Sequence, residues 1–306
     1  MEVPAEPSGR LRAFSELPSV GDWVRARVMP DFALIEEVLP RSTAFLRRAA
    51  GRRAEAQCVA ANIDPVFIVC GLDGDFNARR LERYLLLAKE SGAEPVIVLN
   101  KSDVCDVTES RLAEVKPIAS GAEVLALSAR QSVEPLRRLL GRGRTAALLG
   151  SSGAGKTTIA NALLGGERWR TQSVRESDSR GRHTTSGRML ITLPDGAFLI
   201  DTPGMRELAL WADENTLDSV FEDVADLAAG CRFRDCTHES EPGCEVRAAL
   251  EAGELDTSRW KSFRKLRGEI RRQEMASDVH ARLEQKRKWK QIHKAMRNSD
   301  KSCGKM

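Results

Sequence analysis

The sequence predicts an α/β protein in three parts, with a parallel sheet in the middle part. Between Val66 and Asn100, two apolar strand-like runs flank a segment of helical periodicity, which is the pattern of a β-α-β unit. Short strand-like runs separated by Pro and Gly precede it, and charged helical sequence with a group of cysteines follows it. The 306 residues are enough for two or three cores, and we expect domains at 1–62, 63–222 and 223–306.

The first part predicts a small β-barrel or sandwich. The runs "DWVRARV", "ALIEEVL" and "AEAQCVAANI" have the length and spacing of short strands. In the middle part, the helical segment "ARRLERYLLLAKESG" ends at Gly92 and the strand "PVIVLNKSD" follows it. "TAALLG" and "TTIANALLGG" repeat the plan as strand, glycine loop and helix, and "RMLITL" and "AFLIDTPG", joined by "PDG", predict a hairpin.

The segment "GSSGAGKT" predicts a loop that binds phosphate. It satisfies G-x-x-x-x-G-K-[ST], directly after an apolar strand and at the start of a helix. Its glycines let backbone N–H groups surround an oxyanion, and the helix N-terminus adds a positive pole. Lys156 would reach the β- and γ-phosphates and Thr157 would bind Mg²⁺. The residues assigned to the nucleotide here are Gly150, Ser151, Ser152, Gly153, Ala154, Gly155, Lys156, Thr157 and Thr158.

A second motif, "DTPG", ends the second strand of the hairpin. Its carboxylate, Asp201, can hold Mg²⁺ through water, and the Gly204 N–H can sense a γ-phosphate. An Asp-containing turn after a strand is common, so this motif gains its meaning from the phosphate loop.

Two further motifs favour a guanine base over adenine. The Asp103 carboxylate can accept both the N1–H and the exocyclic amine of guanine, while Asn100 braces the loop and the Lys101 stem covers the base. A backbone N–H of "SAR" can reach the guanine oxygen. The alternative for "NKSD" is a strand end with an Asp cap on the next helix. The assigned residues are Asn100, Lys101, Ser102 and Asp103 in "NKSD", and Ser128, Ala129 and Arg130 in "SAR".

The order of these motifs is a rotation of the usual one. An ordinary small GTPase begins with the phosphate loop, whereas here the order is NKSD, SAR, phosphate loop, "GRHTTSG" and DTPG. A rotation keeps every strand in place if the old termini are joined and a new break is opened, which α/β domains tolerate because their termini often lie close together. We therefore expect a circularly permuted domain whose hairpin leads directly into the C-terminal part.

Cys231, Cys236, His238 and Cys244 form a C-x4-C-x-H-x5-C cluster. Zn²⁺ prefers tetrahedral sets of thiolate and imidazole, and a closed set of four ligands is typical of a structural site. The segment has little apolar content, so metal binding would largely fold it. The alternative is a group of buried or redox cysteines, which so polar a segment in a reducing compartment does not favour.

Positive charge is concentrated at the C-terminal end. Residues 259–306 contain 16 Lys or Arg against five Asp or Glu, and the rest of the chain has a net charge of −7. Trp260, Phe263 and Trp289 lie among these charges, so the segment is a candidate for RNA contact; the alternative is a solvated helix whose aromatic residues pack against the cysteine cluster. No run approaches the roughly 20 apolar residues of a membrane span, and no secretion signal is recognisable. We expect a cytoplasmic monomer.

This arrangement resembles the RsgA (YjeQ) family, circularly permuted GTPases that depend on the small ribosomal subunit. The resemblance runs from about Gly9 to Lys294 and is carried by "VGDWV", "VAANID", "NKSD", "GSSGAGKTT", "GRHTT", "DTPGMRE", "CRFRDCTHESEPGC" and "RWKSFRKL". It implies an N-terminal OB-fold, a permuted GTPase domain and a C-terminal zinc domain. It also implies a role in late maturation of the small ribosomal subunit, with GTP, GDP and rRNA as partners.

The chain departs from the family pattern at its start. Family members usually carry further strand-forming residues upstream of "SGRLR", and an OB barrel needs five strands. Three or four are recognisable here, so we expect an incomplete barrel and a true start codon upstream of Met1.

One expected catalytic group is absent from the motifs. Met205 directly follows DTPG, where Ras-like enzymes place a glutamine that orients the attacking water, and a thioether cannot do this. His183 in "GRHTTSG" is the candidate, as the resemblance also implies, because an imidazole can hold or polarise a water. A surface loop histidine is the alternative. Thr185, with Thr184 second, is the candidate switch hydroxyl on Mg²⁺, and Lys156 completes the catalytic set.

These residues together predict a Mg²⁺-dependent GTPase with one structural Zn²⁺, slow alone and stimulated by the small ribosomal subunit. The alternative from another class is an RNA-binding scaffold that holds guanine nucleotide with little turnover. A P-loop ATPase or kinase is disfavoured by Asp103.

Overall fold

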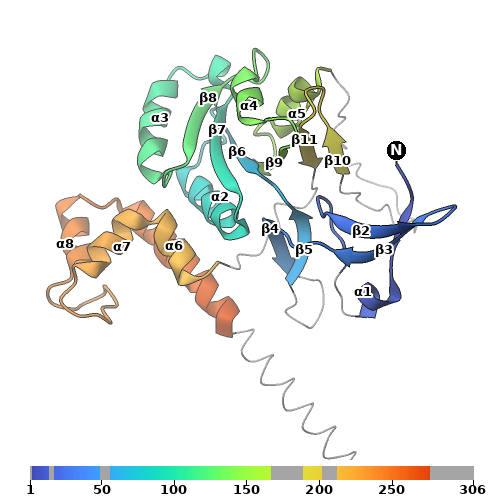
Figure 1. Cartoon of the computed structure of the whole chain (residues 1–306). Coiled ribbons are helices and arrows are strands. Elements are labelled where there is room, and N and C mark those ends of the chain that lie inside the picture. The colour runs from blue at the N-terminus through green and yellow to red at the C-terminus, as the bar shows by residue number, and fades with distance from the viewer. Residues whose placement is uncertain (1, 14–16, 49–55, 167–188, 202–211, 276–306) are drawn as a thin grey trace, which may run out of the picture.

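The computed structural model describes residues 2–13, 17–48, 56–166, 189–201 and 212–275. At its centre lies a six-stranded sheet with the strand order β10-β11-β9-β6-β7-β8 (Figure 1). Neighbouring strands from β11 to β8 are parallel, and β10 pairs antiparallel with β11, as expected for the hairpin. The strands are β6 (Pro65–Gly71), β7 (Glu94–Asn100), β8 (Glu123–Leu127), β9 (Thr145–Gly150), β10 (Met189–Thr192) and β11 (Phe198–Asp201).

The parallel strands bring the rotated motifs to one edge of the sheet. β7, β8 and β9 end at Asn100, Leu127 and Gly150, and the segments NKSD, SAR and the phosphate loop leave from these ends. Because adjacent parallel strands present their carboxyl ends at the same edge, chain order does not determine which loops meet. The prediction of a permuted α/β domain is confirmed.

Alternate residues of the strands divide the core into two clusters. In β6, Ile68 packs in a cluster with α2 and α3, and its neighbours Phe67 and Val69 pack in a cluster with α4 and α5. The sheet is therefore covered on both faces, which explains why its strands are continuous apolar runs. The segments around the sheet are α2 (Ala78–Ser91), η1 (Ser102–Val104), α3 (Thr108–Val115), η2 (Lys116–Ile118), α4 (Glu134–Leu139) and α5 (Lys156–Leu164).

Helix α2 has clear start and stop signals in the sequence. The Asn77 side chain accepts a hydrogen bond from the Arg80 N–H at 3.0 Å, which caps the helix N-terminus. Gly92 ends the helix with φ of 81°, a left-handed conformation that glycine adopts at little cost. Leu81 and Leu85 lie on the buried face, so the predicted amphipathic helix ending at Gly92 is confirmed.

The N-terminal part contains five short strands and one helix among the described residues. Strands β1, β3 and β2 form one sheet, β4 and β5 form a second, and a bridge between Val20 and Ala60 connects the second sheet to the segment before β2. Strands β2, β3 and β5 correspond to the three strand-like runs expected from the sequence, and β1 and β4 were not expected. The elements are β1 (Ala5–Pro7), α1 (Gly9–Ala13), β2 (Val24–Val28), β3 (Ala33–Val38), β4 (Ala44–Arg48) and β5 (Ala56–Ala61).

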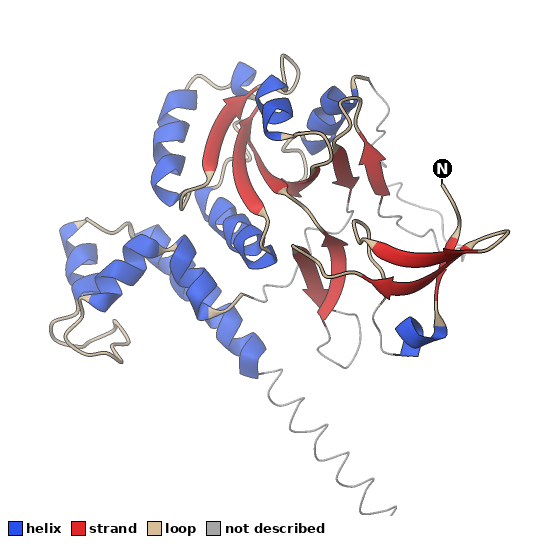
Figure 2. Cartoon of the chain, viewed as in Figure 1, coloured by secondary structure: helices blue, strands red, loops and turns tan. Residues whose placement is uncertain are grey.

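The C-terminal part is helical and packs beside α2 (Figures 1 and 2). Its elements are α6 (Glu214–Val220), α7 (Glu222–Ala229), α8 (Glu245–Ala252) and a helix at 257–275. Phe221, Trp260 and Phe263 are buried in the same cluster as Leu81 and Leu85 of α2. Among the helices that the structure describes, none combines the length and apolarity that crossing a membrane requires.

Candidate functional site

Asn100, the last residue of β7, joins three loops by hydrogen bonds. Its Nδ2 donates to the Ala154 carbonyl of the phosphate loop at 3.0 Å, and its Oδ1 accepts from the Ala129 N–H of SAR at 3.0 Å. Its own carbonyl accepts from the Leu72 N–H, just after β6, at 2.8 Å. Asn100 is only 2% exposed, so these bonds form away from water and are costly to break. Three motifs far apart in the chain thus belong to one hydrogen-bonded unit.

Two glycines of the phosphate loop are required by close packing. A Cβ on Gly155 would lie 2.1 Å from Asn100 Nδ2, and the φ of 99° at this residue is one that side-chain-bearing residues rarely adopt. A Cβ on Gly150 would lie 2.2 Å from the Val69 carbonyl oxygen. The loop leads directly into α5, so it ends at a helix N-terminus, which attracts anions.

Lys156, at the start of α5, lies across the phosphate loop. Its ammonium donates to the carbonyls of Gly150 at 2.7 Å and Ser151 at 2.5 Å. Ser152 in the loop and Thr158 in the first turn of α5 are exposed, and Thr157 is half-buried. The loop therefore presents backbone and hydroxyl groups to solvent, and the Lys156 ammonium lies against the loop carbonyls. This arrangement suits the binding of a phosphate group.

The expected guanine-binding residues form the neighbouring wall of the site. Lys101 has φ of 68°, the left-handed region, and Asp103 is exposed in η1. Ser128 is 4% exposed and its Oγ has no hydrogen-bond partner among the described residues, while Arg130 is exposed. A buried hydroxyl without a partner is costly, so a polar group arriving at this loop would relieve that cost.

Sequence reasoning missed the loop between β6 and α2, which also borders the phosphate loop. Asp75 accepts a hydrogen bond from the Ser151 hydroxyl and pairs with Arg80 of α2 at 2.8 Å. Asp73 pairs with Lys101, and this hydrogen bond from the ammonium is the main cause that holds the pKa of Asp73 below its ordinary value. The segment "GLDGDFN" carries no general motif, so two carboxylates after a strand were the only available signal.

Several predicted residues lie outside the described residues. These are the candidate catalytic histidine, the two switch threonines, the glycine of DTPG, the methionine after it and the last tryptophan: His183, Thr184, Thr185, Gly204, Met205 and Trp289. Asp201 is described only as the last backbone position of β11. Their roles stay predictions.

The four predicted metal ligands come together in space. Sγ of Cys231 lies 3.6 Å from His238 Nδ1 and 3.9 Å from Cys244 Sγ, and Cys244 Sγ lies 3.4 Å from His238 Nδ1. The donor atoms of these three residues and Cys236 all lie within 4.8 Å of one another. The cluster can hold a metal ion.

The surroundings of the cluster fix its geometry. His238 has φ of 61°, and its ring packs edge-on against Trp260 with centroids 5.6 Å apart. Burial lowers the pKa of His238, which favours the neutral imidazole that binds metals. Trp260 is 8% exposed and stacks on Phe263, so both aromatic rings fasten the helix 257–275 to the cluster. Of the two roles considered for these aromatics, the structure favours packing.

Comparisons with known proteins agree with this geometry. The model of the RsgA GTPase family matches residues 38–211, which is more than half of the chain. A protein of Xanthomonas euvesicatoria pv. vesicatoria named small ribosomal subunit biogenesis GTPase RsgA is 53% identical over 258 residues, covering 83% of this chain and 70% of that protein. A protein of the same name from Opitutus terrae is 47% identical over 99% of this chain and 87% of its own length.

The chain belongs to the RsgA GTPase family. Among solved structures, YjeQ from Thermotoga maritima is similar with a TM-score of 0.62 and 27% sequence identity, covering 88% of this chain and 90% of that one. A model of ABC transporters also matches residues 134–301. That range begins after NKSD and SAR but includes the phosphate loop, which ABC transporters share with other P-loop proteins. The family assignment therefore depends on the guanine-side motifs and on similarity across almost the whole chain.

We predict that Asn100→Ala weakens both the fold and nucleotide binding. The change leaves the buried Ala154 carbonyl and Ala129 N–H without partners, which should lower the free energy of unfolding by about 2 to 4 kcal/mol. Urea unfolding followed by circular dichroism measures this. Gln131→Ala, which removes an exposed amide next to the same loop, should stay within about 0.5 kcal/mol of the unmodified protein. Equal stability of the two variants would contradict the bridging role of Asn100.

Proposed function

We propose that the chain is a GTP hydrolase that acts in late maturation of the small ribosomal subunit and uses hydrolysis to time its release from rRNA. The names of relatives that are 47 to 53% identical support this role. The observation that carries the nucleotide part is the Asn100 side chain, which bonds at once to the phosphate loop and to SAR. A phosphate-binding loop and a guanine-binding loop fixed in this way can hold the two ends of one nucleotide.

Each group then has a defined task toward GTP. The backbone N–H groups from Ser151 to Gly155 and the N-terminus of α5 would surround the phosphates, and Lys156 would neutralise the β- and γ-phosphates. Asp103 would read the base, since it is exposed at the end of the loop that Asn100 braces. Ser128 and Ala129 would contribute the opposite side of the base pocket.

Mg²⁺ fits the remaining oxygen groups. Thr157 follows Lys156 at the start of α5, and Asp201 ends β11, which pairs directly with β9 and so lies beside the strand that leads into the phosphate loop. Together with Thr185 these oxygens are the ligands that Mg²⁺ prefers. When bound, the ion would offset negative charge on the β- and γ-phosphate oxygens.

Hydrolysis needs a group that orients water, and we assign this to His183. Met205 occupies the position where a glutamine would serve, so an imidazole from "GRHTTSG" is the available polar group. An incomplete site of this kind would turn over slowly alone. Binding to the small ribosomal subunit would then complete the catalytic site and stimulate hydrolysis.

The absence of a glutamine after DTPG also supports one alternative function. A chain that holds GTP and RNA without useful turnover would serve as a scaffold, and Met205 is the observation that favours it. The basic residues of 259–306 would contact rRNA in either case. In both cases we place the protein in the cytoplasm as a monomer.

Phosphate release with and without purified small subunits separates the two functions. A GTPase should be stimulated strongly by the subunits at saturating GTP and Mg²⁺, and His183→Ala should lose most of that stimulation because no side chain then holds the water. His293→Ala is a control at a histidine outside all motifs. Turnover that the subunits leave unchanged would favour the scaffold.

The cysteine cluster fits Zn²⁺ as a structural ion. Zn–S bonds of about 2.3 Å and Zn–N bonds of about 2.0 Å in a tetrahedron place sulfur atoms about 3.8 Å apart and sulfur and nitrogen about 3.5 Å apart. The separations of 3.9, 3.6 and 3.4 Å in the structure match this geometry. Four protein ligands leave no open position, so the ion would supply folding energy and no chemistry.

We predict that Cys236→Ser lowers zinc content and the melting temperature. Removing one of four ligands weakens a site whose binding energy folds the polar segment around it. Zinc measured by atomic emission should fall below one equivalent, and thermal unfolding should begin earlier. Cys105→Ser, at a cysteine outside the cluster, should keep one zinc. Stoichiometric zinc with an unchanged melting curve in Cys236→Ser would refute the assignment.

A further inference from the structure

The loop between β6 and α2 contacts two parts of the nucleotide site, the phosphate loop and NKSD. Asp75 accepts from the Ser151 hydroxyl of the phosphate loop and is held in turn by Arg80, whose guanidinium also donates to the Asp75 carbonyl at 3.1 Å. Asp73, two residues earlier, pairs with Lys101 of NKSD. The phosphate loop and NKSD are therefore both tied to the loop that leads into α2.

Helix α2 is built to behave as one rigid piece. It has 14 residues, a capped N-terminus and a glycine stop. Its buried face includes Leu81, Leu85, Leu86 and Ala88, each 1% exposed or less. A helix packed along its length moves as a unit, because its core neighbours cannot deform gradually.

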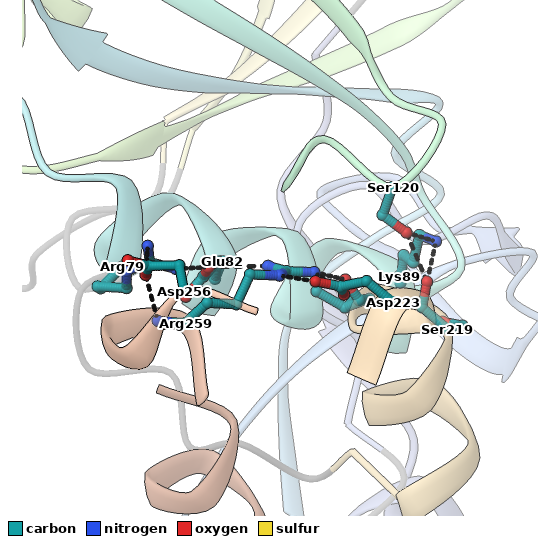
Figure 3. A network of polar contacts seen from close by, with 9 residues as sticks. Arg79, Glu82, Lys89, Ser120, Ser219, Asp223, Asp256 and Arg259 are labelled. Atoms are coloured by element: carbon teal, nitrogen blue, oxygen red, sulfur yellow. Dashed lines mark hydrogen bonds and ion pairs between the residues drawn. The ribbon is translucent and has the colours of Figure 1, made fainter. Parts of the chain in front are cut away.

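The other side of α2 is clamped to the C-terminal helices by a buried arginine (Figure 3). Arg259, 5% exposed, donates to Glu82 of α2 at 2.8 Å and to both carboxylate oxygens of Asp223 at 2.7 Å each. It also donates to the Val220 carbonyl at 3.0 Å and lies 4.4 Å over the Phe221 ring. Glu82 is fully buried, so this pair is almost completely shielded from water, and Arg79 of α2 pairs with the same Glu82 oxygen.

Further polar contacts lie along the same helix. Lys89 donates to the Ser219 carbonyl at 3.0 Å, and the Ser120 hydroxyl donates to the same carbonyl at 2.5 Å. Arg83 pairs with Glu269 at 2.5 Å. Arg79 pairs with Asp256 at 2.8 Å (Figure 3). Helices α6 and 257–275 are thus fastened to α2 by directional contacts, and α7 is joined to helix 257–275 through Asp223 and Arg259.

This interface has a single preferred geometry. A hydrophobic contact tolerates sliding, but a buried charge that loses its partner is strongly penalised. Rotating the C-terminal helices would separate Arg259 from Glu82 or from Asp223, so such a motion must either carry α2 along or break the clamp.

We propose that α2 and its leading loop link the nucleotide site to the C-terminal helices, with Asp75 as a positioning residue at one end and Arg259 as the clamp at the other. The covalent route from β11 into α6 passes through 202–211, and the α2 route is independent of it. The proposal deepens the proposed function, on which it rests for the identity of the site as one for guanine nucleotide. Docking of the C-terminal helices then sets the nucleotide affinity, and nucleotide binding sets the docking by the same factor.

Nucleotide affinity of three full-length variants tests this link without ribosomes. Arg259→Lys keeps the charge but loses the fork that joins two carboxylates, and Asp223→Asn removes one partner from the half-exposed side of the clamp. Asp75→Asn alters the loop end. Arg247→Gln breaks an exposed pair within α8 and is the matched control in the same region. Dissociation constants for fluorescent GDP and GTP analogues are measured with Mg²⁺ at a temperature where thermal melts show each variant folded.

We expect each clamp variant and Asp75→Asn to weaken nucleotide binding by about fivefold or more, while Arg247→Gln binds normally. The double variant Asp75→Asn/Arg259→Lys should bind about as weakly as Asp75→Asn alone, because the clamp acts through the loop. A purely structural role would lower the melting temperature and leave affinity unchanged. Should Arg259→Lys fail to fold, Asp223→Asn gives the same comparison.

Normal affinity in the folded clamp variants, or losses that multiply fully in the double variant, would overturn the link. These results differ from a failure of the proposed function. If the unmodified protein binds no guanine nucleotide, the site assignment is wrong. If it binds guanine nucleotide and the clamp variants bind it with unchanged affinity, the site assignment is retained and the link through α2 is wrong.

Discussion

The buried Asn100 amide is the interaction on which the site depends. Its donor and acceptor are both used, on Ala154 and Ala129, and no other orientation of the amide satisfies both. Gly155 is needed because the same side chain fills the space of its missing Cβ. A single residue at the end of β7 therefore requires glycine at position 155 and positions SAR against the phosphate loop. Because these are contacts in space, they survive the rotation of motif order along the chain.

The rotation changes what the sheet edge is connected to. In this chain β11 is followed along the sequence by α6, and α6 packs on α2 next to the buried Arg259. The C-terminal helices thus meet the α/β domain both through the chain and through a charged interface. The DTPG segment and the loop before α2, where Asp75 contacts Ser151, would therefore act on the same C-terminal helices.

Local patterns predicted the elements that carry their own signals. The continuous apolar run of β6, the periodicity of α2 with its Gly92 stop, and the hairpin turn "PDG" each identified an element correctly. The pairing of cysteines and histidine was predictable because four donors within 14 residues leave few other geometries. The strand β4 was missed because Arg47 and Arg48 interrupt its apolar pattern and Phe45 is the one well-buried residue among its described side chains. Asp75 and Ser151 are separated by 76 positions in the chain, and Glu82 and Arg259 by 177 positions. No local sequence pattern therefore predicts these contacts.

In the proposed function, NKSD and the phosphate loop, held together by Asn100, would bind the two ends of one guanine nucleotide. The nucleotide selectivity of the Asp103→Asn variant tests this arrangement. An amide in place of the carboxylate should bind guanine less well and xanthine better, because the 2-position of xanthine carries an oxygen instead of an amine. We expect affinity for fluorescent GDP to fall at least tenfold while affinity for the xanthosine diphosphate analogue rises. Unchanged preference for GDP in this variant, with Lys156 still required for binding, would contradict the claim.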